Sequence, residues 1–159
     1  GKGPCTAFEV NGEPLFEAEA KQDPVLARVL NQAKSLGYEL KYDQENDELV
    51  YDALLEQDLY QRVHIERLKS PSFEGLDAIR FVSPCFSLSS SKMRSLKKDQ
   101  LLELLLRNDR DEMYCAFALS EKRKALVVEA TQIVNTMDDD EFVTLLDHVK
   151  KVAGEYRSI

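Results

Sequence analysis

The sequence has no tryptophan and contains only two histidines, three cysteines, five prolines and six glycines among 159 residues. The low content of glycine and proline argues against a long disordered linker. No run of about 18 apolar residues is present to span a bilayer, and residues 1–5 lack the apolar core of a signal peptide. We therefore expect a soluble, cytoplasmic protein with no membrane-inserted segment.

The three cysteines are too few and too scattered for a disulfide framework. Cys5, Cys85 and Cys115 are odd in number and form no C-x-x-C pair, so neither disulfides nor a zinc site is predicted. Cys85 and Cys115 lie among apolar residues, and we expect both to be reduced thiols in the core. The acidic run at 138–140 does not predict a metal site either, because a helix N-terminus already accounts for it.

Catalytic and nucleotide-binding patterns are also missing. His64 and His148 fall in different predicted elements, and no G-x-S-x-G motif is present. The sequence has neither a G-x-G-x-x-G motif nor a P-loop to hold phosphates. We therefore predict no catalytic residue, no cofactor and no metal, and a protein that is not an enzyme.

The charge balance narrows the class of partner. Acidic residues outnumber basic ones by 29 to 21, and the formal net charge is -8. Nucleic acids and anionic lipids bind positive surfaces, so neither is a predicted partner. Basic clusters at 92–98 and 122–124 lie in predicted loops, where charged side chains are commonly solvated. A basic or apolar protein partner fits the composition better.

The length suits one compact domain, to which we assign residues 23–159. Residues 1–22 differ from the rest of the chain. An Asn11-Gly12 turn between short apolar pieces predicts a small hairpin. Pro14 would remove a hydrogen-bond donor from such a hairpin, so a flexible N-terminal arm fits equally well.

The first half of the domain predicts one helix followed by strands. Asp23 is the expected N-cap, Pro24 the first helical residue, and Gly37 the left-handed stop of a helix over 24–36. Strand-like runs follow at 38–42, 49–51 and 59–68, and β character continues at 78–82.

Two features of these strands bear on the sheet. In the run 59–68, alternation places Val63 and Ile65 on one face. It places the polar residues Arg62, His64 and Glu66 on the other face, which we expect to be exposed to solvent. Pro84 is expected to mark a break or an edge, because proline cannot donate to a strand ladder.

The last third of the chain predicts a hairpin and a long closing helix. Apolar and β-branched runs at 113–119 and 125–134 flank a polar turn at 120–124. Asp138 is the expected cap of the final helix, and Glu141 completes a capping-box pair with it. The predicted fold class is therefore α+β, an antiparallel twisted sheet with helices packed on it.

A short helix at 100–107 is apolar on nearly every side. It contains five leucines around Glu103, and one face cannot bury all of them. Two interpretations remain open: a sheet beneath and a partner subunit above, or a central buried helix of a monomer.

The predicted elements follow the order α-β-β-β-α-β-β-α. The leucine-rich segment 101–108 leads into the hairpin and then into the acidic start of the closing helix, residues 137–142. Over residues 24–156 the sequence resembles the class I type III secretion chaperone-like superfamily, which includes the Tir chaperone family and the YbjN-like proteins.

The resemblance implies a protein-binding homodimer that holds an extended segment of a client protein. It implies dimer contacts at Leu101, Leu102, Leu105 and Leu106. It places Leu26, Val29, Leu30, Val63 and Ile65 against the core or the client. The alternative is a YbjN-like regulatory or structural module without an effector client. A small enzyme is the third hypothesis.

Overall fold

The computed structural model describes residues 23–69, 75–89, 91, 98–111 and 114–157. For residues 98, 102, 104 and 108–111 it describes the backbone only. The arm or hairpin predicted for residues 1–22 lies outside the described residues. Within the described part of the chain, no helix is both long and apolar enough to cross a membrane.

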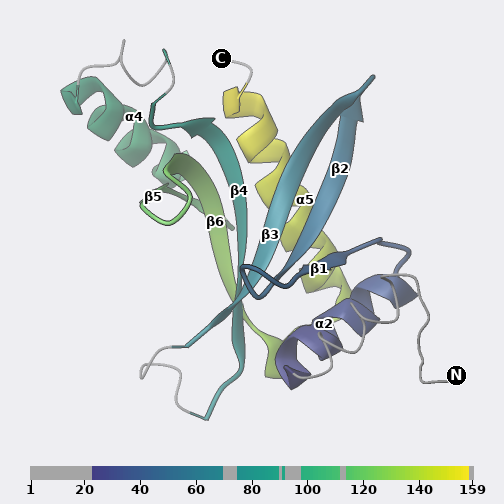
Figure 1. Cartoon of the computed structure of the whole chain (residues 1–159). Helices are drawn as coiled ribbons and strands as arrows, with labels where there is room; N and C mark the ends of the chain where they lie inside the picture. The colour runs from purple at the N-terminus through teal and green to yellow at the C-terminus, as the bar shows by residue number, and fades with distance from the viewer. Residues whose placement is uncertain (1–22, 70–74, 90, 92–97, 112–113, 158–159) are drawn as a thin grey trace, which may run out of the picture.

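The domain is built on a six-stranded antiparallel sheet with the strand order β1-β2-β3-β4-β6-β5 (Figure 1). The strands are β1 (Lys41–Asp43), β2 (Glu48–Glu56), β3 (Leu59–Leu68), β4 (Ala78–Ser87), β5 (Ala116–Ser120) and β6 (Ala125–Ile133). The helices are α2 (Pro24–Ser35), α4 (Lys98–Asp111), the short 3-10 helix η2 (Val134–Thr136) and α5 (Asp139–Arg157).

The predicted fold class is confirmed, with one strand more than the predicted order. Four strands separate α2 from α4, and they correspond to the strand-like runs predicted at 38–42, 49–51, 59–68 and 78–82, of which the first overlaps the short β1. The predicted strand at 59–68 coincides with β3, and the predicted hairpin is formed by β5 and β6.

Local signals set the ends of α2 as predicted. The carboxylate of Asp23 accepts hydrogen bonds from the main-chain N–H groups of Val25 and Leu26. At the other end Gly37 has φ +86°, a left-handed conformation that glycine adopts without strain. The N–H of Tyr38 then donates to the Ala33 oxygen, which completes a Schellman motif.

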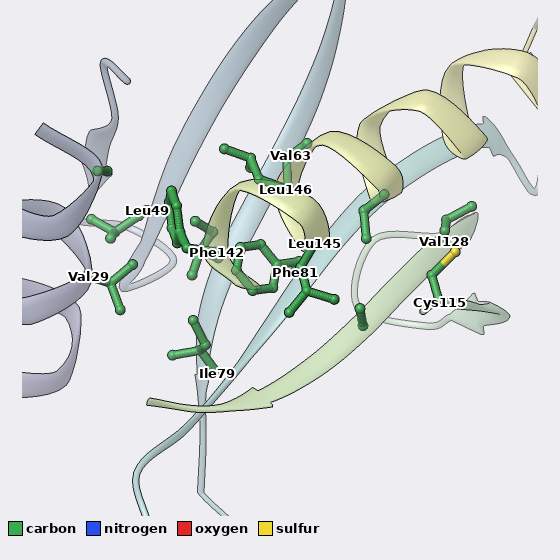
Figure 2. Packing of buried hydrophobic residues seen from close by; sticks show 14 of the residues in the cluster. Val29, Leu49, Val63, Ile79, Phe81, Cys115, Val128, Phe142, Leu145 and Leu146 are labelled. Atoms are coloured by element: carbon green, nitrogen blue, oxygen red, sulfur yellow. The ribbon is translucent and has the colours of Figure 1, made fainter. Parts of the chain in front are cut away.

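The core lies between the sheet and the two helices α2 and α5. Alternate residues of the strands point toward the helices, as a period of two requires. Figure 2 shows Phe142, Leu145 and Leu146 of α5 over the sheet, with the rings of Phe142 and Phe81 in edge contact, 5.8 Å between centroids. The start of α5 is fixed by the predicted capping box, since Asp138 and Glu141 each accept the other's main-chain N–H.

The sheet divides partway along β3 and β4. The β3–β4 pairing ends at His64 and Val82, whereas β4 stays paired with β6 as far as Ser87. The register of β4 on β6 shifts between Pro84 and Phe86, so the break predicted at Pro84 is a bulge, and it lies beyond the last β3–β4 pair. Beyond this point the β2–β3 hairpin leans away from β4 and β6 (Figure 1).

Buried side chains bridge the two halves where the ladder ends. The amide of Gln61 donates to Ser83 Oγ at 2.8 Å and to the main-chain oxygen of Pro84 at 2.7 Å. Ser83 Oγ in turn donates to the Arg62 oxygen at 2.6 Å. The β2–β3 hairpin is thus a projecting arm, joined to β4 by side chains at its base.

Candidate protein-binding surfaces

The described residues include six large apolar side chains that are exposed. Five of them fall on two parts of the molecule, the β2–β3 hairpin and the region of α4 and β5. They are Leu54 and Tyr60 on the hairpin, and Leu106, Tyr114 and Leu119 on or beside α4 and β5. Leu54 and Tyr60 are cross-strand partners, so their exposed side chains lie next to each other on the hairpin. Contiguous exposed apolar surface is a candidate for protein interaction.

The first surface is the outer edge of β2. β1 pairs with β2 only at residues 48–50, so residues 51–56 of β2 have no strand beside them on that edge within the described part of the chain. An unpaired strand edge presents main-chain N–H and C=O groups that can pair with an added strand. Leu54, 59% exposed, lies on this segment.

A groove runs between the same hairpin and α5. Its volume is about 520 Å³, and its lining residues are Leu54, Leu55, Glu56, Leu59, Asp147, Lys150, Lys151, Gly154 and Glu155. The hairpin contributes mainly leucines, and α5 contributes charges of both signs. A Cβ at Gly154 would lie 3.0 Å from Leu55 Cδ1, so glycine permits the close approach of α5 to the hairpin.

The second surface combines α4 with β5. Leu101 is buried and Leu105 packs against the core, so this side of the helix faces its own domain. Leu106 is 74% exposed, while the side chain of Leu102 lies outside the described residues. β5, which contacts α4, adds Leu119 with 50% exposure. Of the predicted dimer residues whose side chains are described, Leu101 and Leu105 therefore face the domain and Leu106 faces outward.

The residues expected to face the core or the client lie in the core. Leu26, Val29 and Leu30 of α2, with Val63 and Ile65 of β3, are all buried in the main hydrophobic cluster. In this conformation they offer no surface to a client. Their periodic spacing correctly indicated a buried face, but a core and a binding face produce the same pattern.

The hairpin surface was not among the sites predicted from the sequence. Leu54 and Leu55 precede the turn at Gln57 and Asp58, and Leu59 and Tyr60 follow it. Consecutive apolar residues on both sides of a turn cannot all face one core, and that pattern was the available signal.

The two histidines do not converge. His148 lies edge-on to Tyr114, with ring centroids 5.9 Å apart. His64 contacts Glu48 on the face of the sheet opposite the helices. Among the described residues, no three His, Cys, Asp or Glu side chains are arranged to hold a metal ion.

Glu48 is the most strongly perturbed titratable group of the described residues. Its side chain is fully buried, which by itself raises the pKa, but hydrogen bonds from His64 and Arg123 outweigh burial and lower the pKa to about 2. The face of β3 that carries His64 was predicted to be exposed to solvent. It is partly covered, because Arg123 of the β5–β6 turn lies over it.

No protein-family model matches the sequence, and no curated protein matches it. Solved structures do match. A chain of the HopA1–SchA chaperone–effector complex has a TM-score of 0.52 at 10% identity, covering 95% of this chain and 100% of that chain. A chain of the structure of the Yersinia pestis type III secretion chaperone SycH with a stable fragment of YscM2 has a TM-score of 0.50 at 13% identity, covering 82% and 97%.

This protein has a type III secretion chaperone fold. The predicted resemblance is confirmed at the level of the fold, including the antiparallel sheet and the closing helix. The secretion chaperone fold here places the hairpin arm and the α4–β5 surface at different sides of the sheet, since β2 lies near one edge and β5 forms the other.

Proposed function

We propose that this protein is a non-enzymatic chaperone-type domain that binds an extended segment of a client protein along the open edge of β2. The observation that supports the proposal is the six-residue edge at 51–56 beside a leucine-lined groove. The fold adds support, because SchA and SycH belong to structures of chaperones with protein partners.

The geometry suits strand addition. A typical strand has about 5 or 6 residues, which matches the length of the open edge. Main-chain hydrogen bonds to β2 would supply affinity, and alternate side chains of the client would enter the groove. The leucines of the groove favour apolar side chains at those alternate positions.

The charges of the groove do not select strongly for one sign. Lys150 and Lys151 lie near Asp147, Glu155 and Glu56, and Lys150 is 3.6 Å from Asp147. The net charge of -8 acts at longer range and favours a client segment that is neutral or basic overall.

We propose further that two copies associate through the α4–β5 surface. Leu106 and Leu119 are exposed there, while Leu101 and Leu105 anchor the same helix to its own domain. This surface is separate from the β2 edge, so a dimer would carry two client sites.

Three exposed leucines allow the two roles to be tested separately. Leu54→Glu alters the β2 edge, Leu106→Glu alters α4, and Leu76→Glu alters neither surface. The full chain and each variant are used to capture partners under native conditions, and the captured protein is treated with protease to recover the segment that the domain protects. A synthetic peptide of that segment then gives affinities, and sedimentation gives the association state.

We expect Leu54→Glu to lose the peptide but remain associated, and Leu106→Glu to become monomeric but keep the peptide. Leu76→Glu should resemble the wild type in both respects. Hydrogen exchange at residues 51–56 should slow when the peptide binds. Absence of a protected client segment, or equal peptide affinity for Leu54→Glu, would refute the client site.

A further inference from the structure

A buried carboxylate at the start of β2 binds a turn that lies far away in the sequence. Glu48 is fully buried and lies on the face opposite α2 and α5, since its neighbour Leu49 is in the core beneath the helices. Arg123 Nη2 donates to Glu48 Oε2 at 2.6 Å, and Nη1 donates to Oε1 at 3.3 Å. The two residues are 75 positions apart.

A second carboxylate lies directly beside the first. Glu48 and Glu66 are cross-strand partners in β2 and β3. Like charges in such a pair repel each other. Here the turn supplies the compensating cations: Arg123 and Lys122 each have a nitrogen 3.3 Å from Glu66 Oε2, and Lys122 Nζ is 3.5 Å from Glu48 Oε2. The two glutamates form a binding site for this turn.

His64 orients the carboxylate of Glu48. Its Nδ1 lies 2.6 Å from Glu48 Oε1, and the ionised carboxylate can only accept, so Nδ1 is the donor. With Oε1 held by His64 of β3, Oε2 is directed at Arg123. Arg80 of β4 lies 3.8 Å from both Glu66 and Glu129.

The β5–β6 hairpin is also held by β6, which pairs with β4 over residues 125–133. On the face opposite the helices, its other contacts are few among the described residues. β5 pairs only with β6, over five residues. The apolar contact beneath the turn consists of Val82, Ala125 and Val127, with Ala118 packed against them. One main-chain hydrogen bond, from Leu88 N to the Lys124 oxygen, joins the turn to the end of β4.

We infer that Glu48 and Arg123 form a latch that holds the β5–β6 turn against β2 and β3, and that this latch sets the position of β5 in the α4–β5 surface. The second half of the inference rests on the proposed self-association through that surface. Glu48 contacts neither α4 nor β5 in the hydrogen bonds and ion pairs of the described residues, so its effect would pass through Arg123 and the turn.

Hydrogen exchange of the full chain tests the latch without a client. The variants are Glu48→Leu, Arg123→Leu and the double variant, with Glu48→Gln as a variant of nearly equal shape. The control is the pair Asp52 and Arg62, each changed to Leu and then both. That pair also links β2 to β3, with bonds of 2.7 and 2.9 Å, but does not contact the turn.

Each single latch variant should speed exchange at residues 118–126 about tenfold, the size expected for residues of one ion-pair network. Amides of α5 that exchange by local opening, without global unfolding, should change much less. The double variant should add little to either single one, because a buried charge without its partner is worse than no pair at all. The exposed control pair should change exchange at 118–126 by less than about twofold.

If the locally exchanging amides of α5 accelerate by the same factor as residues 118–126, the pair supports only global stability and the latch is refuted. Strictly additive single effects would refute it as well. If Glu48→Leu does not fold, the latch is tested with Arg123→Leu and Glu48→Gln. Arg123→Leu alters only the turn, and Glu48→Gln keeps the shape of the side chain.

Sedimentation of the same variants tests the second half of the inference, that the latch sets the position of β5 in the α4–β5 surface. Weaker self-association of Glu48→Leu and Arg123→Leu, with the control pair unchanged, supports it. A monomeric wild type refutes it together with the proposed dimer, and leaves the exchange result to decide the latch.

Discussion

Arg157, in the last turn of α5, donates a hydrogen bond of 2.7 Å to the main-chain oxygen of Tyr60, which lies 97 residues earlier in β3. The same nitrogen lies 3.2 Å from the side-chain oxygen of Gln61. This contact ties the projecting β2–β3 hairpin to the end of the helix that forms the other wall of the groove. The width of the proposed client groove therefore depends partly on one exposed arginine.

Replacing Arg157 with alanine should free this part of the hairpin. We expect a loss of about 1 kcal/mol in the free energy of unfolding, typical of a hydrogen bond in a protein. Urea denaturation measures the loss, and faster amide exchange at residues 59–62 would locate it. Arg157→Lys keeps the charge and one donor and should lose less. Unchanged amide exchange at residues 59–62 in Arg157→Ala would contradict a stabilising contact between Arg157 and the hairpin.

The residues first considered for client binding should behave as core residues. Ile65→Ala removes a fully buried side chain and should destabilise the domain by about 2 to 5 kcal/mol. Leu54→Ala, at an exposed position, should change the free energy of unfolding by less than about 0.5 kcal/mol. Chemical denaturation of both variants checks the contrast. A stable Ile65→Ala protein with altered partner binding would show that Ile65 faces the client instead.

Glu48 should make stability depend on acid pH. Hydrogen bonds from His64 and Arg123 hold the pKa of Glu48 at about 2, below the ordinary 4.5. The folded state thus binds this proton less readily than the unfolded state. The contribution of Glu48 is complete above pH 4.5 and disappears as the pH falls toward 2.

The expected size of that contribution is on the order of 3 kcal/mol. Urea denaturation of the wild type and Glu48→Gln between about pH 6 and pH 2.5 should give curves that converge as the pH falls. Asp52→Asn is the control, because the pKa of Asp52 is also lowered by Arg62 but the pair is exposed. Parallel curves for the wild type and Glu48→Gln would show that the pKa of Glu48 is not lowered in the folded state.

The capping box of α5 provides a local test. Asp138→Ala removes the side chain that accepts the Glu141 N–H at 2.8 Å, and should cost about 1 kcal/mol of stability. Asp138→Ser restores an N-cap acceptor and should recover most of the loss. Thermal or urea unfolding measures both. Equal destabilisation by alanine and serine would mean that the cap itself contributes little.

Much of the fold was predictable because its signals are satisfied within a few residues. Asp23 caps Val25 and Leu26, and Gly37 ends the same helix, so their meaning does not depend on the rest of the chain. The β5–β6 hairpin was predictable for the same reason. The run predicted at 38–42 overlaps the short β1, but the bounds of β1 depend on its pairing with β2.

The proposed binding surfaces were less predictable, since spacing reveals an apolar face but not what covers it. Leu101 and Leu106 belong to one leucine-rich helix, yet one is buried and the other is exposed. Val63 and Ile65 alternate as a binding strand would, but α2 and α5 cover their side of the sheet.

The sequence by itself determined the two ends of α2, the start of α5 and the turn of the β5–β6 hairpin, because caps and turns act over short distances. Only the tertiary structure decided that the edge of β2 is open at residues 51–56, and that Arg123 meets Glu48 across 75 residues. The physical reason is that both depend on the order of strands in the sheet and on how far the β5–β6 hairpin folds over it. Neither the strand order nor the position of the β5–β6 hairpin is set by any single segment of the sequence.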